Sequence, residues 1–176
     1  MRTFTLCAVL VFCFSLFSFG QSYETSFYGE DKLKSPIRIP EKILNVLKKD
    51  KAVQRCFGAE PQMQDLRNWF EAAKINLNDD NYSDILIKGK DDIRKKESNC
   101  INGNAVSFWL FRKKQNGYEL VLRLYTITVE IGTKKSGGFY NINTIRNTAN
   151  ASYTTFYAFK RNKYVEIGKK ERPITN

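Results

Sequence analysis

VSFWLFRK, residues 106–113, is the stretch that decides the fold class. In an extended strand Phe108 and Leu110 point to one face, while Trp109 and Phe111 point to the other. Apolar side chains on both faces are typical of a central strand that is covered on both sides. The sequence therefore predicts a covered sheet, with helices from elsewhere in the chain as the natural cover for one face.

The twofold period of this strand continues through the second half of the chain. The expected strands are 84–88, 105–113, 118–131, 139–146, 153–160 and 163–167. Asn116-Gly117 predicts a hairpin turn between the second and third strands, and Arg161-Asn162 is expected to turn the last pair. Within 118–131 the apolar set shifts by one residue, which predicts a bulge or tight turn near 124–126.

The N-terminal third has helical spacing instead. Ile43, Leu44 and Leu47 recur at helical intervals, and Gly58 ends a second short segment. Pro61 opens PQMQDLRNWFEAAK, whose apolar residues fit one helical face. The expected fold is therefore α+β, with N-terminal helices packed on an antiparallel β-sheet of about five to six strands.

The first twenty residues, MRTFTLCAVLVFCFSLFSFG, have the layout of a secretory signal, in which a cation precedes an apolar run and small residues. The run is too short to span a bilayer comfortably, and no second apolar stretch follows it. We therefore expect a periplasmic or extracellular protein without a transmembrane segment once the signal is removed. The expected organisation is a signal peptide at 1–20, a tail or linker at 21–40 and a single domain at 41–170.

Two of the four cysteines, Cys7 and Cys13, lie in the signal. The mature chain keeps Cys56 and Cys100, which we expect to form a disulfide in an oxidising compartment. The alternative is a pair of buried free thiols, because geometry decides whether two cysteines can be joined.

One segment, NLNDDNYSDI, has oxygen-bearing side chains at alternate positions. Asn76, Asn78 and Asp80 are placed to point inward from a tight loop, and Asp84 is placed to close the site. Hard oxygen ligands at short spacing predict a Ca²⁺ site. It is not an EF-hand, because Ile87 stands where that loop has a bidentate Glu. The alternative is that these side chains cap backbone groups in Asx turns.

The loop resembles the D-x-N-x-D-G-x-x-D-[LI] loop of FG-GAP/VCBS-type secreted proteins. Over about residues 41–167, WFEAAKINLNDDNYSDILIKG, GNAVSFWLFRKKQNGYELVL after a Cys, and YTTFYAFKRNKYVEI are similar to small exported bacterial proteins of unassigned activity. The resemblance implies architecture and export rather than a reaction. Asn76 and Asn81 replace the first Asp and the Gly of the pattern, which predicts weak Ca²⁺ affinity, millimolar in order of magnitude.

Charge limits the function further. Lys+Arg total 29 against 18 Asp+Glu, a net charge of +11, and the chain has no histidine. That absence excludes His-based triads and His-containing zinc sites. The lysines come in scattered pairs, which favours a solvated surface over a dedicated polyanion site. Trp109, Phe111, Tyr118 and Tyr125 are assigned to the core rather than to a stacking platform.

These observations predict a secreted or periplasmic, non-enzymatic interaction or structural module with a weak structural Ca²⁺ as its one cofactor. Its expected partner is an unknown protein or an anionic surface polymer, and nucleic acid is not expected. The first alternative is a polyanion-binding protein that uses its basic surface. The second is a hydrolase without histidine, which would need two carboxylates facing one another in a cleft.

Overall fold

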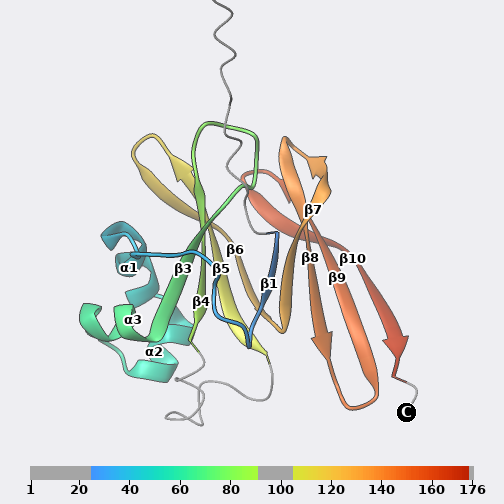
Figure 1. Ribbon diagram of the computed structural model, residues 1–176, viewed down its shortest axis with the longest axis horizontal. Coiled ribbons are helices and arrows are strands. Elements are labelled where there is room, and N and C mark those ends of the chain that lie inside the picture. The colour runs from blue at the N-terminus through green and yellow to red at the C-terminus, as the bar shows by residue number, and fades with distance from the viewer. Residues whose placement is uncertain (1–24, 91–104, 175–176) are drawn as a thin grey trace, which may run out of the picture.

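The computed structural model describes residues 25–90 and 105–174. Three helices and ten strands lie in these ranges (Figure 1). The helices are α1 (Glu41–Lys48), α2 (Lys51–Phe57) and α3 (Met63–Trp69). The strands are β1 (Ser26–Tyr28), β2 (Pro36–Ile37), β3 (Phe70–Ile75), β4 (Asp84–Gly89), β5 (Val106–Lys114), β6 (Gly117–Thr126), β7 (Thr128–Ser136), β8 (Phe139–Asn147), β9 (Ala151–Lys160) and β10 (Lys163–Pro173).

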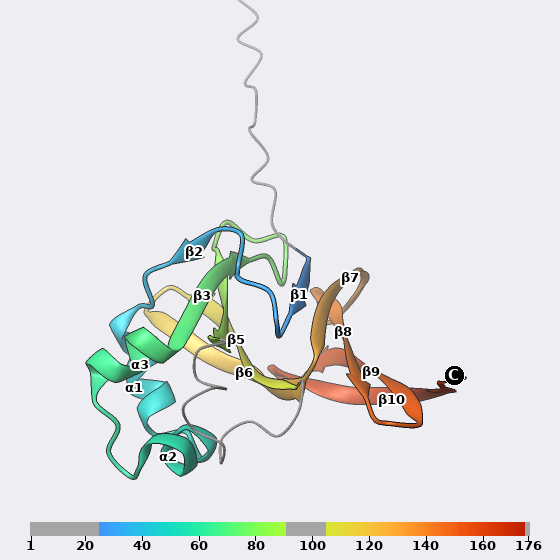
Figure 2. The same cartoon turned by 60° about the horizontal axis from the view of Figure 1, so that its bottom comes forward.

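The strands form two antiparallel sheets. Sheet A has the order β1-β7-β8-β9-β10, and sheet B has the order β2-β3-β4-β5-β6. The helices and sheet A lie on opposite sides of sheet B (Figure 2). The predicted α+β class with N-terminal helices is confirmed, but the strands form two sheets of five where one sheet of five to six was expected.

The two sheets meet at a corner at Ile127. Strand β6 ends at Thr126 and β7 begins at Thr128, so a single residue carries the chain from sheet B to sheet A. The carbonyl of Ile145 accepts from the Thr126 hydroxyl at 2.6 Å and from the Ile127 N–H at 3.0 Å. The phase slip in 118–131 therefore marks a change of sheet, which is why one expected strand is two.

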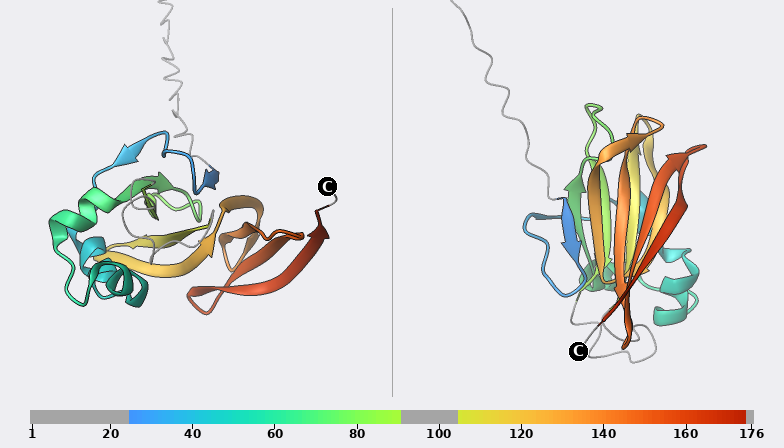
Figure 3. Two further views of the ribbon diagram at one scale, coloured as in Figure 1. Left: turned by 90° about the horizontal axis from the view of Figure 1, so that it is seen from below. Right: turned by 90° about the vertical axis from the view of Figure 1, so that its right-hand side faces the viewer.

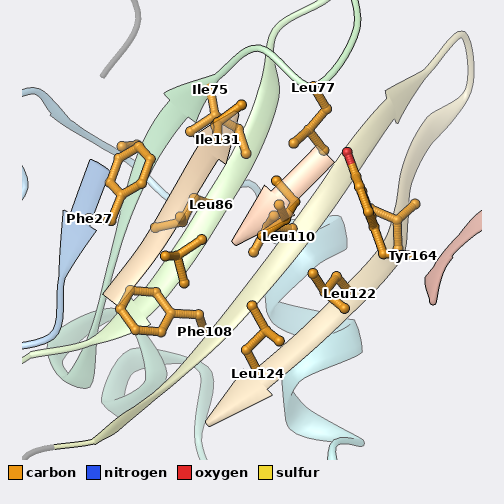
Figure 4. Close-up of a cluster of buried hydrophobic side chains, with 14 of the residues drawn as sticks. Phe27, Ile75, Leu77, Leu86, Phe108, Leu110, Leu122, Leu124, Ile131 and Tyr164 are labelled. Carbon is orange, nitrogen blue, oxygen red and sulfur yellow. The ribbon is translucent and has the colours of Figure 1, made fainter. Parts of the chain in front are cut away.

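A first hydrophobic core, core 1, fills the space between the sheets (Figure 4). Phe108 and Leu110 enter it from β5, and Ile142 enters it from β8, each with its side chain fully buried. Phe27 of β1 covers one edge of core 1. The prediction that this face of β5 is covered is therefore confirmed, and its cover is a second sheet.

A second core, core 2, lies between the helices and the opposite face of sheet B. Ile43, Leu44 and Leu47 of α1 are fully buried there. Trp109 and Phe111 meet them from β5, at 2% and 0% exposure. One apolar face of β5 is thus buried in core 1 and the other in core 2. Burial of both faces stabilises sheet B as the middle layer.

Two segments differ from the prediction. Residues 21–40 were expected to be a tail, but β1 pairs with β7 and β2 pairs with β3, and Phe27 and Leu33 are buried. Phe70–Ile75 was expected to continue the third helix, but it forms β3 between β2 and β4. Pairing with β4, every residue of which is buried, outweighs the helical propensity of a short Ala-containing segment.

Lys88 holds the N-terminal strand against sheet B. Its ammonium group donates to the carbonyl oxygens of Tyr28 and Gly29, each at 3.2 Å, and to that of Asp31. It also pairs with the Glu71 carboxylate at 3.0 Å. The residue is 1% exposed, and a buried charge is tolerated only when it is paired and hydrogen-bonded in this way.

The predicted signal peptide, residues 1–20, lies outside the described residues, and so does Cys100. In 25–90 and 105–174, none of the helices has both the length and the apolar character needed to cross a bilayer.

Candidate functional site

The loop between β3 and β4 brings together three of the four predicted calcium ligands. Asn76 Oδ1 accepts from the Asn78 N–H at 3.2 Å, and Asp80 Oδ1 accepts from the Tyr82 N–H at 2.8 Å. The Asn78 amide donates to Asp80 Oδ2 at 2.7 Å. The first two contacts, to backbone N–H groups two residues on, are those of Asx turns, the alternative role of this loop.

Asp84, the fourth predicted ligand, is fully buried at the start of β4. Its carboxylate accepts from the backbone N–H groups of Leu77 at 2.9 Å and Lys113 at 2.8 Å, which ties the loop to β5. Burial raises the pKa of Asp84 to about 6. The two backbone hydrogen bonds lower the pKa, but their effect is smaller than that of burial. In the described part of the chain, no three His, Cys, Asp or Glu side chains are grouped so as to hold a metal. Calcium binding by the four residues stays a prediction.

The same loop is fastened to sheet A through Asp79. Its carboxylate accepts from the Tyr140 hydroxyl at 2.7 Å and pairs with Lys135. The hydrogen bond from Lys135, and then that from Tyr140, hold the pKa of Asp79 below its usual value. The Tyr140 N–H also donates to the Leu77 carbonyl at 2.7 Å. This loop therefore bridges the two sheets at one end of core 1.

Cys56 lies in α2 as a half-buried thiol. Its expected partner, Cys100, is not among the described residues, so the disulfide stays a prediction.

A cleft of about 390 Å³ opens beside the corner at Ile127, between the end of β6 and the faces of β8, β9 and β10. Three cationic side chains line it: Arg123 from β6, Arg146 from β8 and Lys169 from β10. Its eleven lining residues include no carboxylate. The cleft therefore concentrates positive charge that the sequence showed only as scattered residues.

The cleft exists because sheet A extends beyond sheet B. On the inner face of sheet A, Ile142 and Tyr157 pack on core 1, and Thr144, Thr155 and Arg146 continue the same face beyond them. That end of sheet A projects away from the helices (Figure 3). Because no layer covers it there, the polar residues of this face line open space next to the edge strand β6.

Aromatic and acidic neighbours hold the cations in position. The Lys169 ammonium lies 4.4 Å from the ring centroid of Tyr153, and the Arg146 guanidinium lies 5.9 Å from that of Tyr125. Arg123 Nε lies 3.6 Å from Asp50 Oδ2. Cation–π contacts of this kind contribute about 0.5–2 kcal/mol each and restrict a side chain that is otherwise free to move. The positive charge of the cleft is thus partly preorganised.

Hydroxyl groups fill the space between the cations. Four threonines and three tyrosines are among the eleven lining residues. Burial, and then the negative charge of Glu166, raise the pKa of Tyr157, so its phenol keeps its proton at neutral pH. The Thr148 hydroxyl donates to the Ala151 carbonyl at 3.1 Å, which orders the β8–β9 turn at the mouth of the cleft.

Sequence reasoning missed this site. Tyr125 was assigned to the core, but it is 38% exposed and lines the cleft, whereas Trp109 and Phe111 are buried as predicted. One local signal was available: Tyr153, Thr155 and Tyr157 repeat at the strand period in YTTFY and mark a polar face. Comparison of the chain with protein families, with curated proteins and with solved structures gives no match.

Proposed function

We propose that the protein is an exported, non-enzymatic binding module whose cleft holds the anionic groups of a polymer. The observation that carries the proposal is the convergence of Arg123, Arg146 and Lys169 on one cleft without a lining carboxylate. The scattered lysines of the sequence favoured a solvated surface. The arrangement in space of Arg123, Arg146 and Lys169 supports the alternative of a basic surface that binds polyanions.

The chemistry of the cleft suits anion binding. A guanidinium group can donate two parallel hydrogen bonds to a sulfate, phosphate or carboxylate group, and hydrogen bonds to charged groups contribute about 1.5–3 kcal/mol each. The ring contacts of Lys169 and Arg146 lower the entropy that these long side chains lose on binding. Several such contacts to one polymer chain reinforce one another, since the second binding event is intramolecular.

Binding fits the lining better than catalysis does. General acid–base chemistry at neutral pH is most often carried out by a histidine or a carboxyl group, and the lining of the cleft contains neither. A glycosidase-type hydrolase needs two facing carboxylates, and the lining residues of the cleft include none. The eleven residues supply cations and hydroxyl groups, which recognise rather than transform an anion.

The test measures the affinity of the mature chain for heparin, used as a generic polyanion, by titration at several salt concentrations. The double variant Arg146→Ala, Lys169→Ala is compared with Lys160→Ala, Lys163→Ala, which removes equal charge at the other end of the same hairpin. Lys163 lies six residues from Lys169, about 20 Å along the strand. We expect at least a tenfold loss for the cleft variant, less than threefold for the control, and a flatter salt dependence for the cleft variant alone. Equal losses in the two variants would mean diffuse attraction and would overturn the proposal.

A further inference from the structure

The cations of the cleft are separated by hydroxyl-bearing residues. Arg146 on β8 and Lys169 on β10 lie on either side of β9, two strands apart, or about 10 Å across the sheet. The β9 residues paired with them are Tyr153, opposite Arg146, and Thr155, opposite Lys169. The inner face of sheet A therefore presents two neighbouring rows across β8, β9 and β10. One row is Thr144, Thr155 and Lys169, and the other is Arg146, Tyr153 and Glu171, in which the Tyr153 hydroxyl donates to the Glu171 carboxylate at 3.3 Å.

The tyrosine rings are poorly placed for stacking on nucleobases. Lys169 lies over the Tyr153 ring and Arg146 over the Tyr125 ring, while Tyr157 packs against core 1. Single-stranded nucleic acid is held mainly by bases stacked on open aromatic faces. A ligand that binds the cations through its anionic groups does not need the tyrosine rings. It therefore leaves the contacts of Lys169 with Tyr153 and of Arg146 with Tyr125 in place.

The hydroxyl content points to a ligand that is itself rich in hydroxyls. Seven of the eleven lining residues carry a hydroxyl. The hydroxyls of Thr126, Thr148 and Tyr153 donate to oxygen atoms of the protein and keep lone pairs that accept, and a hydroxyl in general both donates and accepts. Sugar hydroxyls have the same dual character. The volume of about 390 Å³ lies at the small end of ligand pockets, about 300–1,000 Å³, and suits a short saccharide segment.

We infer that the occupant of the cleft is an acidic polysaccharide, whose anionic groups meet Arg146 and Lys169 and whose ring hydroxyls meet the Thr155 hydroxyl and donate to the Tyr153 oxygen. The inference rests on the proposed function, because it names the ligand class of the same cleft. It requires that binding depend on the hydroxyls as well as on the cations.

The experiment compares two probes of similar charge, a sulfated hexasaccharide and inorganic polyphosphate, by calorimetric titration. Thr155→Val removes one hydroxyl but keeps the β-branched shape that suits a strand, and Thr154→Val makes the same change on the other face of β9. We expect Thr155→Val to weaken hexasaccharide binding three- to tenfold and polyphosphate binding less than twofold. Thr154→Val should change neither. Tyr153→Phe is a second test, and because it also frees the Glu171 carboxylate, its result is the loss of hexasaccharide binding beyond the loss of polyphosphate binding. Thermal melting of each variant verifies that it is folded.

The outcomes separate the two proposals. If Thr155→Val and Tyr153→Phe leave hexasaccharide binding unchanged while Arg146→Ala, Lys169→Ala still weakens it tenfold, the polysaccharide inference fails and the polyanion cleft stands. Tighter binding of a single-stranded oligodeoxythymidylate than of the hexasaccharide, at matched charge and salt, also overturns the inference in favour of nucleic acid. If the cationic variant changes the binding of neither probe, both proposals fail.

Discussion

Asp50 Oδ2 accepts a hydrogen bond from Trp109 Nε1 at 3.1 Å and joins the start of α2 to the central strand β5. Its other oxygen, Oδ1, accepts from the Ala52 N–H at 2.8 Å as the N-cap of α2. Arg123 Nε lies 3.6 Å from the same Oδ2. One carboxylate, only 8% exposed, therefore connects a helix, the core of sheet B and one cation of the cleft.

Asp50→Ala should lower the free energy of unfolding by about 2–4 kcal/mol, because it removes an N-cap and leaves a buried indole N–H without its acceptor. Asp50→Asn keeps a capping oxygen and loses the indole contact, so its loss should be about 1–2 kcal/mol. Urea unfolding of the natural chain and the two variants measures whether Asp50→Ala loses more stability than Asp50→Asn. Equal stability of Asp50→Ala and the natural chain would show that these contacts contribute nothing.

Lys88→Met should lower the free energy of unfolding by about 3–5 kcal/mol, since it leaves the Glu71 carboxylate and three carbonyl oxygens without their buried partner. Amide hydrogen exchange should show the loss first in β1, which Lys88 holds to sheet B. Lys74→Met, at an exposed position on β3, is the matched control and should cost less than about 0.5 kcal/mol. Undiminished protection of Phe27 in Lys88→Met would contradict the assignment.

Asp84 should make the protein less stable as the pH rises. The pKa of Asp84 in the folded chain is about 6, above the usual 3.8 of an aspartate, so the folded state binds this proton more tightly than the unfolded state. The sign follows from linkage: the contribution of Asp84 is most favourable below about pH 4 and declines through pH 6, by roughly 2–3 kcal/mol. Asp84→Asn cannot titrate, so the stability difference between the natural chain and this variant should shrink from pH 4 to pH 7. A difference that does not change with pH would contradict the shift.

Calcium binding at the β3–β4 loop predicts a higher melting temperature in millimolar Ca²⁺ than in chelator, because a ligand that binds the folded state stabilises it. The rise should disappear in Asp80→Ala, which removes one of the charged ligands. Asp79→Ala is the control, since it removes an equal charge from the same loop and keeps all four predicted ligands. Identical melting temperatures in the two solutions would leave backbone capping as the role of this loop.

Export predicts that the secreted protein begins at Gln21 and that Cys56 and Cys100 are joined. Intact mass spectrometry before and after reduction measures both, because the disulfide lowers the mass by two hydrogens. A chain that keeps Met1 and carries two thiols that alkylate without reduction would overturn the prediction.

The sequence by itself determined the features that depend on local periodicity. The two apolar faces of β5, the buried positions of α1 and the turn at Arg161 and Asn162, whose φ angles are 49° and 69°, all follow from neighbours in the chain. The strand Phe70–Ile75 was not predicted, because its local residue pattern is helical. The pairing with β4 that overrides this pattern depends on residues farther along the chain.

Tertiary structure alone decided the cleft. Arg123, Arg146 and Lys169 lie on three strands far apart in sequence, and no local pattern relates them. They converge because the chain changes sheet at Ile127 and because strand register places Arg146 and Lys169 on one face of sheet A. Strand period fixes which residues share a face of one strand, but only the packing of sheets fixes which faces meet and where one of them is left open.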